Sequence, residues 1–295
     1  MSHRDLKSVD RNVDLRPIGM GDVDRVGRFL HEELNRRLSP AKWSAVIQPP
    51  WRMAGPNHGF MLVSGERVLG VYLAFYSERE VDGEVEKFCN LAAWCVAEEY
   101  RSHGLRLLRA ILAQDGYTFT DLSPSGNVVP LNARLKFQYL DTATALVPNL
   151  PWLSWGSGIR VSSDRELIRS TLEGRDLEIF LDHADAAAAY HVVVRRGDRY
   201  CYVMFRRDRR KRFPLLASIL HVGDPELFRA AERHVYSHLL MRFGIVATLA
   251  EKRVVKHHPP MSIPLRSVRP KMFRSSRLRP AQVDYLYSEL TCVPW

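Results

Sequence analysis

Residues 96–106 read Val-Ala-Glu-Glu-Tyr-Arg-Ser-His-Gly-Leu-Arg. An apolar run ends at Val96, and an amphipathic stretch begins directly after Gly104, so the order predicts a strand, a tight turn and the start of a helix. The first helical turn has unpaired N–H groups and a partial positive charge, and both favour phosphate binding. Gly104 lacks a Cβ, which lets the backbone approach a ligand closely. With Arg101 and Arg106 at its edges, this segment is a candidate pyrophosphate cradle.

The composition is that of a soluble globular protein. The chain has 295 residues, of which 46% are hydrophobic and 26% charged, and this length suggests about two domains. No stretch approaches the roughly 20 apolar residues that span a bilayer. The first residues are polar and lack the apolar core of a signal peptide. We therefore expect a cytoplasmic protein without a membrane span.

The positive charge favours anionic partners. The formal net charge is +10, which suits coenzyme A, an acidic carrier protein or nucleic acid. The densest basic run, 206–212, lies between two predicted strands and is either a solvated hairpin loop or a docking patch for an acidic carrier protein. No motif for reading bases accompanies the charge, so a nucleic-acid partner is not expected.

The cysteines and histidines carry no metal-binding pattern. The four cysteines are scattered without a CxxC pair, and no HxxxH or HExxH arrangement occurs, so we predict structural thiols and no metal site. Cys95 lies near the end of the strand before the cradle. A covalent mechanism would need a base beside it, and no histidine is linked to it by sequence.

The chain repeats one rhythm of elements in its two halves. The expected strands and helices of the first half run in the order β-α-α-β-β-β-α-β-α-β and span residues 14–18, 22–34, 41–47, 60–64, 68–76, 88–96, 105–114, 117–122, 129–135 and 137–146. The second half shows a hairpin (191–194 and 200–205), a strand (215–222), a helix (225–242) and a strand (245–250). Gly116 and Gly244 both separate a helix from a strand, which indicates a divergent internal repeat.

This order and the cradle resemble the GNAT superfamily of N-acetyltransferases. In that family, a strand that ends in Val precedes Arg/Gln-x-x-Gly-x-Gly/Ala at the start of a helix. Val96, Arg101 and Gly104 match those places, whereas Arg106 stands where Gly or Ala is usual. The resemblance implies an α/β fold (an α+β mixed sheet) with two GNAT-like domains in tandem, residues 1–150 and 159–295, the second with a basic C-terminal tail.

The second copy of the turn differs from the first. It reads His-Val-Gly-Asp-Pro-Glu over residues 221–226 and has no Arg-x-x-Gly. Asp224 and Glu226 would repel a phosphate at that helix start. We therefore expect acetyl-CoA, or another acyl-CoA, to bind as co-substrate in the N-terminal domain only.

The resemblance also implies which residues hold acyl-CoA. Asn127 matches a family position that contacts pantetheine or caps the following helix, and Ser123 and Ser125 are nearby alternatives. The backbone near the end of the strand would hold the pantetheine and polarise the acyl carbonyl. The full expected cofactor-binding set is Trp94, Val96, Arg101, Ser102, His103, Gly104, Leu105, Arg106 and Asn127.

For the catalytic acid and base, the sequence follows the family less closely. The family often uses a Glu at or before the same strand as base, and Glu84 and Glu86 are available. We favour Glu86, although either could be an exposed hairpin charge. In the family, the general-acid Tyr lies five residues before the Phe of a Leu-Gly-Phe segment. Residues 135–137, Leu-Lys-Phe, resemble that segment here, so the position of the Tyr is taken by Asn132. Asn132 cannot serve as an acid, which leaves Tyr139, Tyr117 or Tyr100; we favour Tyr139.

Taken together, the residues predict an acyl-CoA-dependent N-acyltransferase. It would move an acetyl or longer acyl group to the amine of a small molecule by direct attack. A small-molecule amine is the expected partner, with an acidic carrier protein as a second possibility. The alternative is a catalytically inactive CoA-binding or structural module on a GNAT scaffold, and Asn132 and Arg106 motivate it.

Overall fold

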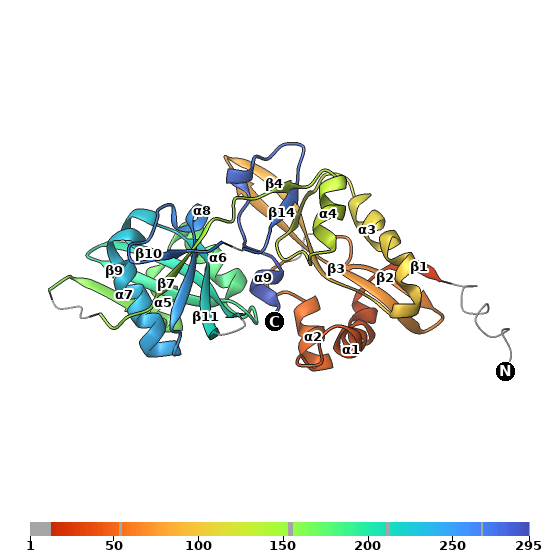
Figure 1. Ribbon diagram of the computed structural model, residues 1–295, viewed down its shortest axis with the longest axis horizontal. Coiled ribbons are helices and arrows are strands. Elements are labelled where there is room, and N and C mark those ends of the chain that lie inside the picture. Colours follow the sequence, from red (N-terminus) through yellow and green to blue (C-terminus); the bar gives the residue numbers. More distant parts are fainter. Residues whose placement is uncertain (1–12, 53–54, 153–155, 211–212, 267, 295) are drawn as a thin grey trace. The chain divides into compact units, whose positions relative to one another are not determined.

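The computed structural model describes residues 13–52, 55–152, 156–210, 213–266 and 268–294 (Figure 1). Its contacts divide the chain into two compact units, one of residues 1–49 and 53–119 and the other of residues 50–52 and 120–295. The boundary falls within one strand, β5 (Thr118–Asp121). Among the described residues, no helix is both long and apolar enough to cross a membrane.

The strands form two seven-stranded mixed sheets, in the orders β1-β2-β3-β4-β5-β14-β6 and β13-β7-β12-β11-β10-β9-β8. The pairings of β3 with β4 and of β10 with β11 are antiparallel, whereas β11 and β12 run parallel. The predicted fold class, a mixed α/β architecture built twice, is confirmed.

The elements up to β7 cover residues 14–148. In chain order they are β1 (Asp14–Pro17), the 3-10 helix η2 (Met20–Asp22), α1 (Val23–Glu33), α2 (Pro40–Ile47), β2 (Gly59–Ser64), β3 (Arg67–Val81), β4 (Glu84–Val96), the 3-10 helix η3 (Glu98–His103), α3 (Gly104–Leu112), β5, α4 (Val128–Arg134), β6 (Gln138–Tyr139) and β7 (Thr144–Pro148).

The later elements cover residues 159–292. They are β8 (Ile159–Ser162), α5 (Arg165–Thr171), α6 (Gly174–His183), β9 (Tyr190–Arg196), β10 (Arg199–Arg210), β11 (Phe213–Val222), α7 (Pro225–Phe243), β12 (Ala247–Glu251), α8 (Lys252–Val255), β13 (Ile263–Pro264), β14 (Met272–Arg274), the 3-10 helix η4 (Pro280–Gln282) and α9 (Glu289–Cys292).

The first unit is organised around the long hairpin of β3 and β4. Gly83, with a φ of 86°, forms part of its turn, where a side chain would be strained. Figure 1 shows α3 on one side of these strands and α1 with α2 on the other. Leu107, Leu108 and Ile111 bury one face of α3, as their helical spacing predicts, and each such side chain contributes about 1.5–3 kcal/mol on burial.

The predicted closing strand of the first half, residues 137–146, is wrong. The chain forms a two-residue strand, β6, and then β7, which pairs with β12 and β13 of the second sheet. β14, from near the end of the chain, pairs with β6 instead. Apolar alternation made residues 137–146 strand-like, but it could not show which sheet would bury them.

Helix α7 is central to the second unit and follows its sequence signals. The Asp224 side chain accepts hydrogen bonds from the N–H groups of Glu226 and Leu227 at the start of the helix. Gly244 ends it in the left-handed conformation, with a φ of 67°. Phe228, Ala231 and other buried residues of α7 pack in one core with strands β9 to β12.

The basic tail, residues 251–295, belongs by its contacts to the second unit. Val283, Tyr285 and Leu290 are buried in a core with Leu122 and Phe273.

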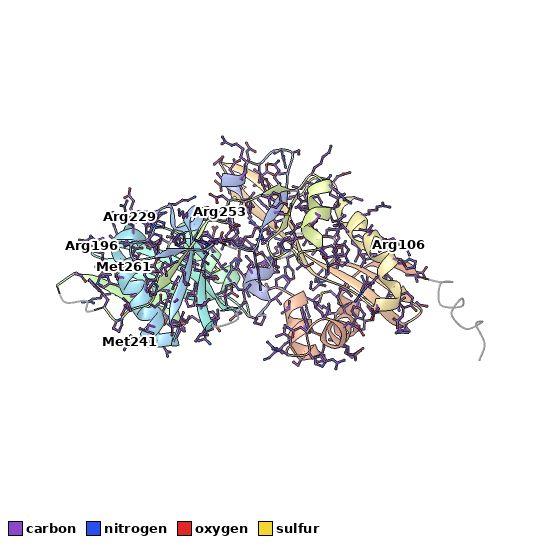
Figure 2. The ribbon with its side chains drawn as sticks, in the orientation of Figure 1. Arg106, Arg196, Arg229, Met241, Arg253 and Met261 are labelled. Carbon is purple, nitrogen blue, oxygen red and sulfur yellow. The ribbon has the colours of Figure 1, made fainter. Side chains whose placement is uncertain are left out.

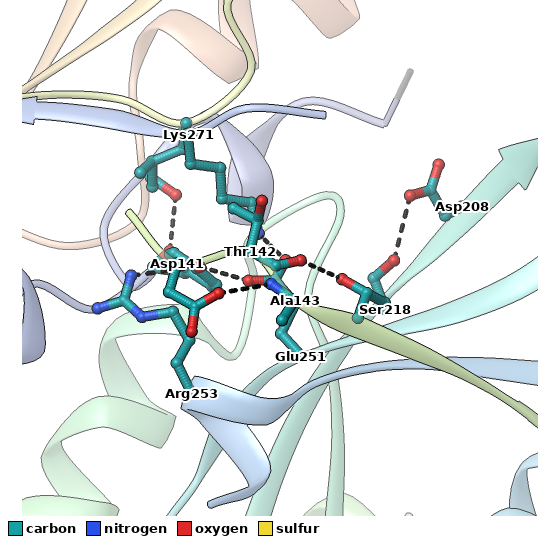
Figure 3. Close-up of polar contacts among 12 residues, drawn as sticks. Asp141, Thr142, Ala143, Asp208, Ser218, Glu251, Arg253 and Lys271 are labelled. Atoms are coloured by element: carbon teal, nitrogen blue, oxygen red, sulfur yellow. Dashed lines mark hydrogen bonds and ion pairs between the residues drawn. The ribbon is translucent and has the colours of Figure 1, made fainter. Parts of the chain in front are cut away.

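A buried ionic network joins Lys271 and Tyr285 of the tail to Glu251 and Arg253 at its start (Figure 3). The Lys271 ammonium contacts a Glu251 carboxylate oxygen and lies 3.6 Å from the centre of the Tyr285 ring. The Tyr285 hydroxyl donates to the other Glu251 oxygen and receives a hydrogen bond from Arg253 at 3.3 Å. Burial lowers the pKa of Lys271, and Glu251 opposes that shift. The paired charges hold the tail to β12 and α8.

Candidate functional site

A bulge interrupts β4 four residues before its turn toward α3. Tyr72 of β3 faces Trp94, but the next residue, Leu73, faces Ala92, so Ala93 is left without a partner in the register. Ala93 has a φ of 42°, a left-handed conformation that costs about 1–3 kcal/mol for a residue with a side chain. Such bulges leave a backbone amide outside the ladder and bend the strand. The bulge therefore supplies a candidate hydrogen-bond donor beside the cradle.

The predicted turn is itself helical. Residues 98–103 form η3, which continues directly into α3. The Gly104 N–H donates to the Arg101 carbonyl oxygen, so this amide is already engaged. The first turn of α3 contains no acidic residue and no side-chain cap. Within α3 no carboxylate occupies the helix start, which favours an anion there, although Glu98 and Glu99 lie in the first turn of η3 just before it.

The structure brings Gly104, Val96 and Trp94 together. A Cβ at position 104 would lie 3.5 Å from Val96 Cγ2 and 3.6 Å from Trp94 Cζ2. The Trp94 indole stacks on Tyr72 with ring centres 4.7 Å apart. Its Nε1 atom is buried and has no hydrogen-bond partner among the described residues. A buried donor without an acceptor costs about 1–3 kcal/mol, so this atom is suited to an oxygen acceptor of a ligand.

The basic residues of the predicted cradle point in different directions. The Arg106 side chain reaches the carbonyl oxygen of Val13, 2.9 Å away, and lies 3.3 Å from His103 Nδ1 (Figure 2). Arg101 is exposed and pairs loosely with Glu98 at 3.6 Å. Ser102 and Leu105 are also exposed at this corner. Arg106 therefore does not fill the space in front of Gly104.

The equivalent turn of the second unit is closed by its own side chains. Asp224 occupies the first amides of α7, and Arg199 pairs with Asp224 at 2.6 Å and with Glu226 at 3.7 Å. A phosphate would have to displace these carboxylates. The start of α3 has no such side-chain cap, and binding of acyl-CoA by the first copy only stays a prediction.

Comparison with solved structures identifies the fold. A GCN5-related N-acetyltransferase from Anabaena variabilis is 13% identical and aligns over 89% of this chain and 72% of its own, with a TM-score of 0.55. One from Kribbella flavida gives the same identity and coverage and a TM-score of 0.54. The chain has the GNAT fold. Saccharomyces cerevisiae N-myristoyltransferase, solved with myristoyl-CoA and inhibitors, is 9% identical over 95% of this chain and 86% of its own, at a TM-score of 0.50.

Comparison of the sequence alone does not reveal this similarity. No protein-family model matches the chain, and no curated protein matches its sequence. The likeness therefore lies in the arrangement of strands and helices rather than in shared residues.

Within the GNAT fold, the two candidate bases differ in burial. Glu86 is 6% exposed on β4 and faces Arg79 of β3 in the register, whereas Glu84 is exposed at the hairpin. Arg79 is also buried, donates to Ser77 at 3.0 Å and lies over the Phe88 ring. The exposed-charge interpretation therefore applies to Glu84 but not to Glu86.

The candidate general acids have different surroundings. Tyr139 is 55% exposed on β6. Tyr100 is the buried residue of η3. Tyr117 packs edge-on against Tyr76, and burial raises its pKa. The geometry selects none of the three over the others.

Asn132 belongs to a buried acidic cluster that sequence reasoning missed. Its side-chain amide donates to Asp121 at 2.8 Å. Burial and the nearby Glu289 raise the pKa of Asp121 to about 7, so this carboxyl can hold a proton near neutral pH. Glu289 accepts from Ser123 Oγ at 2.8 Å and from the Leu122 N–H at 3.2 Å. The signal available in the sequence was only a polar residue at the end of a strand, which is common.

Asn127 lies at the start of α4, but its side chain makes no cap bond there. The helix-capping alternative for Asn127 is therefore not what the structure has.

Two further expectations are settled by burial. Burial raises the pKa of Cys95 to about 11, so its thiol is protonated at neutral pH and is a poor nucleophile. Arg206 is 5% exposed and donates to the carbonyl oxygens of Leu290 and Val293 at 3.2 and 3.4 Å. Arg206 therefore cannot belong to a docking patch, and the patch as predicted over 206–212 is wrong at that residue.

Proposed function

We propose that the protein is an acyl-CoA-dependent N-acyltransferase that acylates the amine of a small molecule. The observation that carries the proposal is the bulge at Ala93, which lies on the strand that leads to Val96, Trp94 and the uncapped start of α3. An interrupted ladder, an unmatched indole N–H and an open helix start favour a ligand rich in carbonyl and phosphate oxygens.

The chain's residues divide the binding work among them. The start of α3, with Gly104, would hold the pyrophosphate, and Arg101 would add positive charge at the edge. Trp94 Nε1 and the Ala93 amide are donors for amide and acyl carbonyl oxygens. When bound, acyl-CoA supplies an activated acyl carbon as a thioester. A donor fixed near the acyl oxygen stabilises the negative charge that develops there in the transition state.

Glu86 is the proposed base, and because it lies seven residues before Ala93 on β4, about 23 Å along the strand at 3.3 Å per residue, it would have to act through a chain of waters. It would take a proton from the substrate ammonium so that the neutral nitrogen can attack. A nitrogen–carbon bond forms, the carbon–sulfur bond breaks, and the sulfur that leaves must gain a proton. We assign that proton to a tyrosine hydroxyl, with Tyr139 the first to be tested, because Asn132 cannot donate one as an acid.

The structurally similar proteins differ in the acyl group that they carry, so the acyl length and the acceptor must be decided by an assay. The name of the GCN5-related N-acetyltransferases refers to acetyl groups, whereas the yeast N-myristoyltransferase was solved with myristoyl-CoA. The same fold thus accompanies short and long acyl groups. Both donors belong in the first assay, with a small-molecule amine as acceptor.

Isothermal titration of the full chain with acetyl-CoA, myristoyl-CoA and free CoA tests the proposal. We expect one site per chain for at least one acyl-CoA. Gly104→Glu should abolish binding, because a carboxylate would then stand at the helix start. Gly21→Glu is the matched control, since a Cβ at that exposed position meets nothing within 4 Å. Equal affinity in both variants would overturn the proposal.

A turnover assay separates the enzyme from an inactive module. The substitution of the usual acid by Asn132 is the observation that favours the inactive alternative. A broad panel of amines, each with both donors, should give product that Glu86→Gln reduces at least tenfold. Binding of acyl-CoA with no turnover of any amine would favour a CoA-binding module instead.

A further inference from the structure

A cavity separate from the cradle lies wholly within the second unit. It has a volume of about 170 Å³ and lies beside the end of β7, one face of α7 and the loop at Met261 (labelled in Figure 2). Its walls are mainly apolar side chains. They come from Val147, Pro148, Leu150, Pro151, Trp152, Glu232, Arg233, Tyr236, Pro260 and Met261.

The chain holds the walls of this cavity in place. The Trp152 N–H donates to Ser237 Oγ of α7 at 3.0 Å, and the Arg233 guanidinium lies over the Trp152 ring at 4.7 Å. Asn149 donates through its side chain to the Ile245 carbonyl oxygen at 2.8 Å. Trp152 is thus fixed to α7, and this part of the cavity wall is pre-formed.

One wall contains a buried carboxylate. Glu232 is 4% exposed, and a carboxylate buried among apolar groups is costly unless it is paired. Its Oε2 atom accepts from the Tyr236 hydroxyl at 3.4 Å and lies 2.9 Å from His257 Nε2. His257 Nδ1 lies 2.8 Å from the Val255 carbonyl oxygen, which only accepts, so Nδ1 carries a hydrogen. The contact between Nε2 and Oε2 therefore contains one further proton.

The other carboxylate oxygen of Glu232, Oε1, can still accept a hydrogen bond. Oε1 makes no hydrogen bond within the described part of the chain, although Glu232 lines the cavity. Packing alone does not require an acidic residue at this position. An acceptor in the wall of an apolar cavity, beside Trp152 and Tyr236, is the arrangement that holds a donor attached to an apolar body.

We propose that this cavity binds a small organic amine, with the ammonium on Glu232 Oε1 and the apolar part against Trp152 and Tyr236. Its volume fits one six-membered ring, since an apolar protein cavity of about 150 Å³ holds benzene. Glu232 Oε1 has only lone pairs to offer, so it can bond only to a donor. Arg233 also lines the cavity, but its guanidinium lies over the Trp152 ring. The site is separate from the cradle at Gly104, and the proposal does not depend on acyl transfer.

Ligand-observed NMR and calorimetry on the full chain, without acyl-CoA, test the site. The probes are benzylamine, benzyl alcohol and benzoate, which share a ring and differ in charge. We expect benzylamine to bind at least tenfold more tightly than the other two. Equal affinity for benzylamine and benzoate would overturn the proposal.

Two variants locate the binding. Trp152→Ala should weaken benzylamine binding at least tenfold, and its fold should persist because Trp152 is 45% exposed. Leu181→Ala is the control, a 49% exposed apolar residue of α6 in the same unit, and it should change nothing. Glu232→Gln should remove the preference for the amine over the alcohol. If benzylamine bound only elsewhere, for example as an acyl acceptor, Trp152→Ala would leave its affinity unchanged and the proposal would fail.

Discussion

The Arg106 guanidinium donates a hydrogen bond to the carbonyl oxygen of Val13, 2.9 Å away, just before β1. This contact takes the long side chain away from Gly104, although Arg106 occupies a motif position where Gly or Ala is usual. We therefore expect Arg106 to support the fold rather than the ligand. Arg106→Ala should cost about 0.5–1.5 kcal/mol of the free energy of unfolding, the value of one such hydrogen bond.

The same variant should leave the Kd for acyl-CoA within about twofold of the wild type, because only a remote charge is lost. Denaturant unfolding and titration calorimetry measure the two quantities. A tenfold loss of affinity would instead place Arg106 in the cradle.

Gly104→Ala separates binding from folding. The added Cβ would be at ordinary contact distance from Val96, and the backbone is helical with a φ of −55°. The Tm should therefore stay equal or rise, as Gly→Ala gains about 0.4–1 kcal/mol at compatible sites. Affinity for acyl-CoA should nevertheless fall at least tenfold, because the methyl group narrows the approach to the helix start. Gly21→Ala, at an exposed site, is the control, and unchanged affinity in Gly104→Ala would argue against the cradle.

Asp121 should give the stability a pH dependence. Its pKa is raised from 3.8 to about 7 in the folded state, so the folded chain binds more protons than the unfolded chain between these values. Stability then decreases as the pH rises from about 4 to 7, by at most about 1.4 kcal/mol per pH unit for one proton.

Asp121→Asn should flatten this slope and raise the stability at pH 8. Urea unfolding at several pH values measures the effect. Identical slopes in the variant and the wild type would show that Asp121 is ionised in the folded state.

The buried network of Lys271 should be sensitive to the loss of one partner. Lys271→Ala leaves the Glu251 carboxylate buried without its cation, which typically costs about 3–5 kcal/mol. Lys252→Ala, at an exposed position of the neighbouring helix α8, should cost less than about 0.5 kcal/mol. Thermal unfolding of the two variants provides the comparison, and similar losses would mean that the ion pair is not coupled to folding.

Asp224→Ala tests the closed turn of the second unit. The substitution removes the bonds to the Glu226 and Leu227 amides and should cost about 0.5–2 kcal/mol. Calorimetry should still find one acyl-CoA site per chain, because Glu226 remains and the turn has no Arg-x-x-Gly. A second site appearing in the variant would show that Asp224 alone keeps the second copy closed.

Local patterns predicted most of the elements, including helix α3 beside the cradle and helix α7 of the second unit. The spacing of Leu107, Leu108 and Ile111 fixed the buried face of α3, and Asp224 with Gly244 marked both ends of α7, because caps and amphipathic faces are local properties. The helices α5 and α6 were missed, since their short patterns resemble polar loops.

Features that depend on distant partners were not available from the sequence. The bulge at Ala93 arises from the register between β3 and β4, and nothing in its own side chain marks it. Asp121 acquires its raised pKa from burial and from Glu289, which is 168 positions later in the chain. The inward turn of Arg206 depends on carbonyl groups of the tail, and a basic run gives no indication of it.

Each sheet contains a strand from the other half of the sequence, and this matters when the chain is split into two fragments. β7, from the first half of the sequence, is a middle strand of the second sheet, and β14, from the last 25 residues, lies within the first. A cut in the segment between β7 and β8 would leave one fragment without β14 and the other without β7. Each product would expose an unpaired strand edge, which invites aggregation. Co-expression of the two fragments, rather than either alone, is the route by which a split protein could recover its structure.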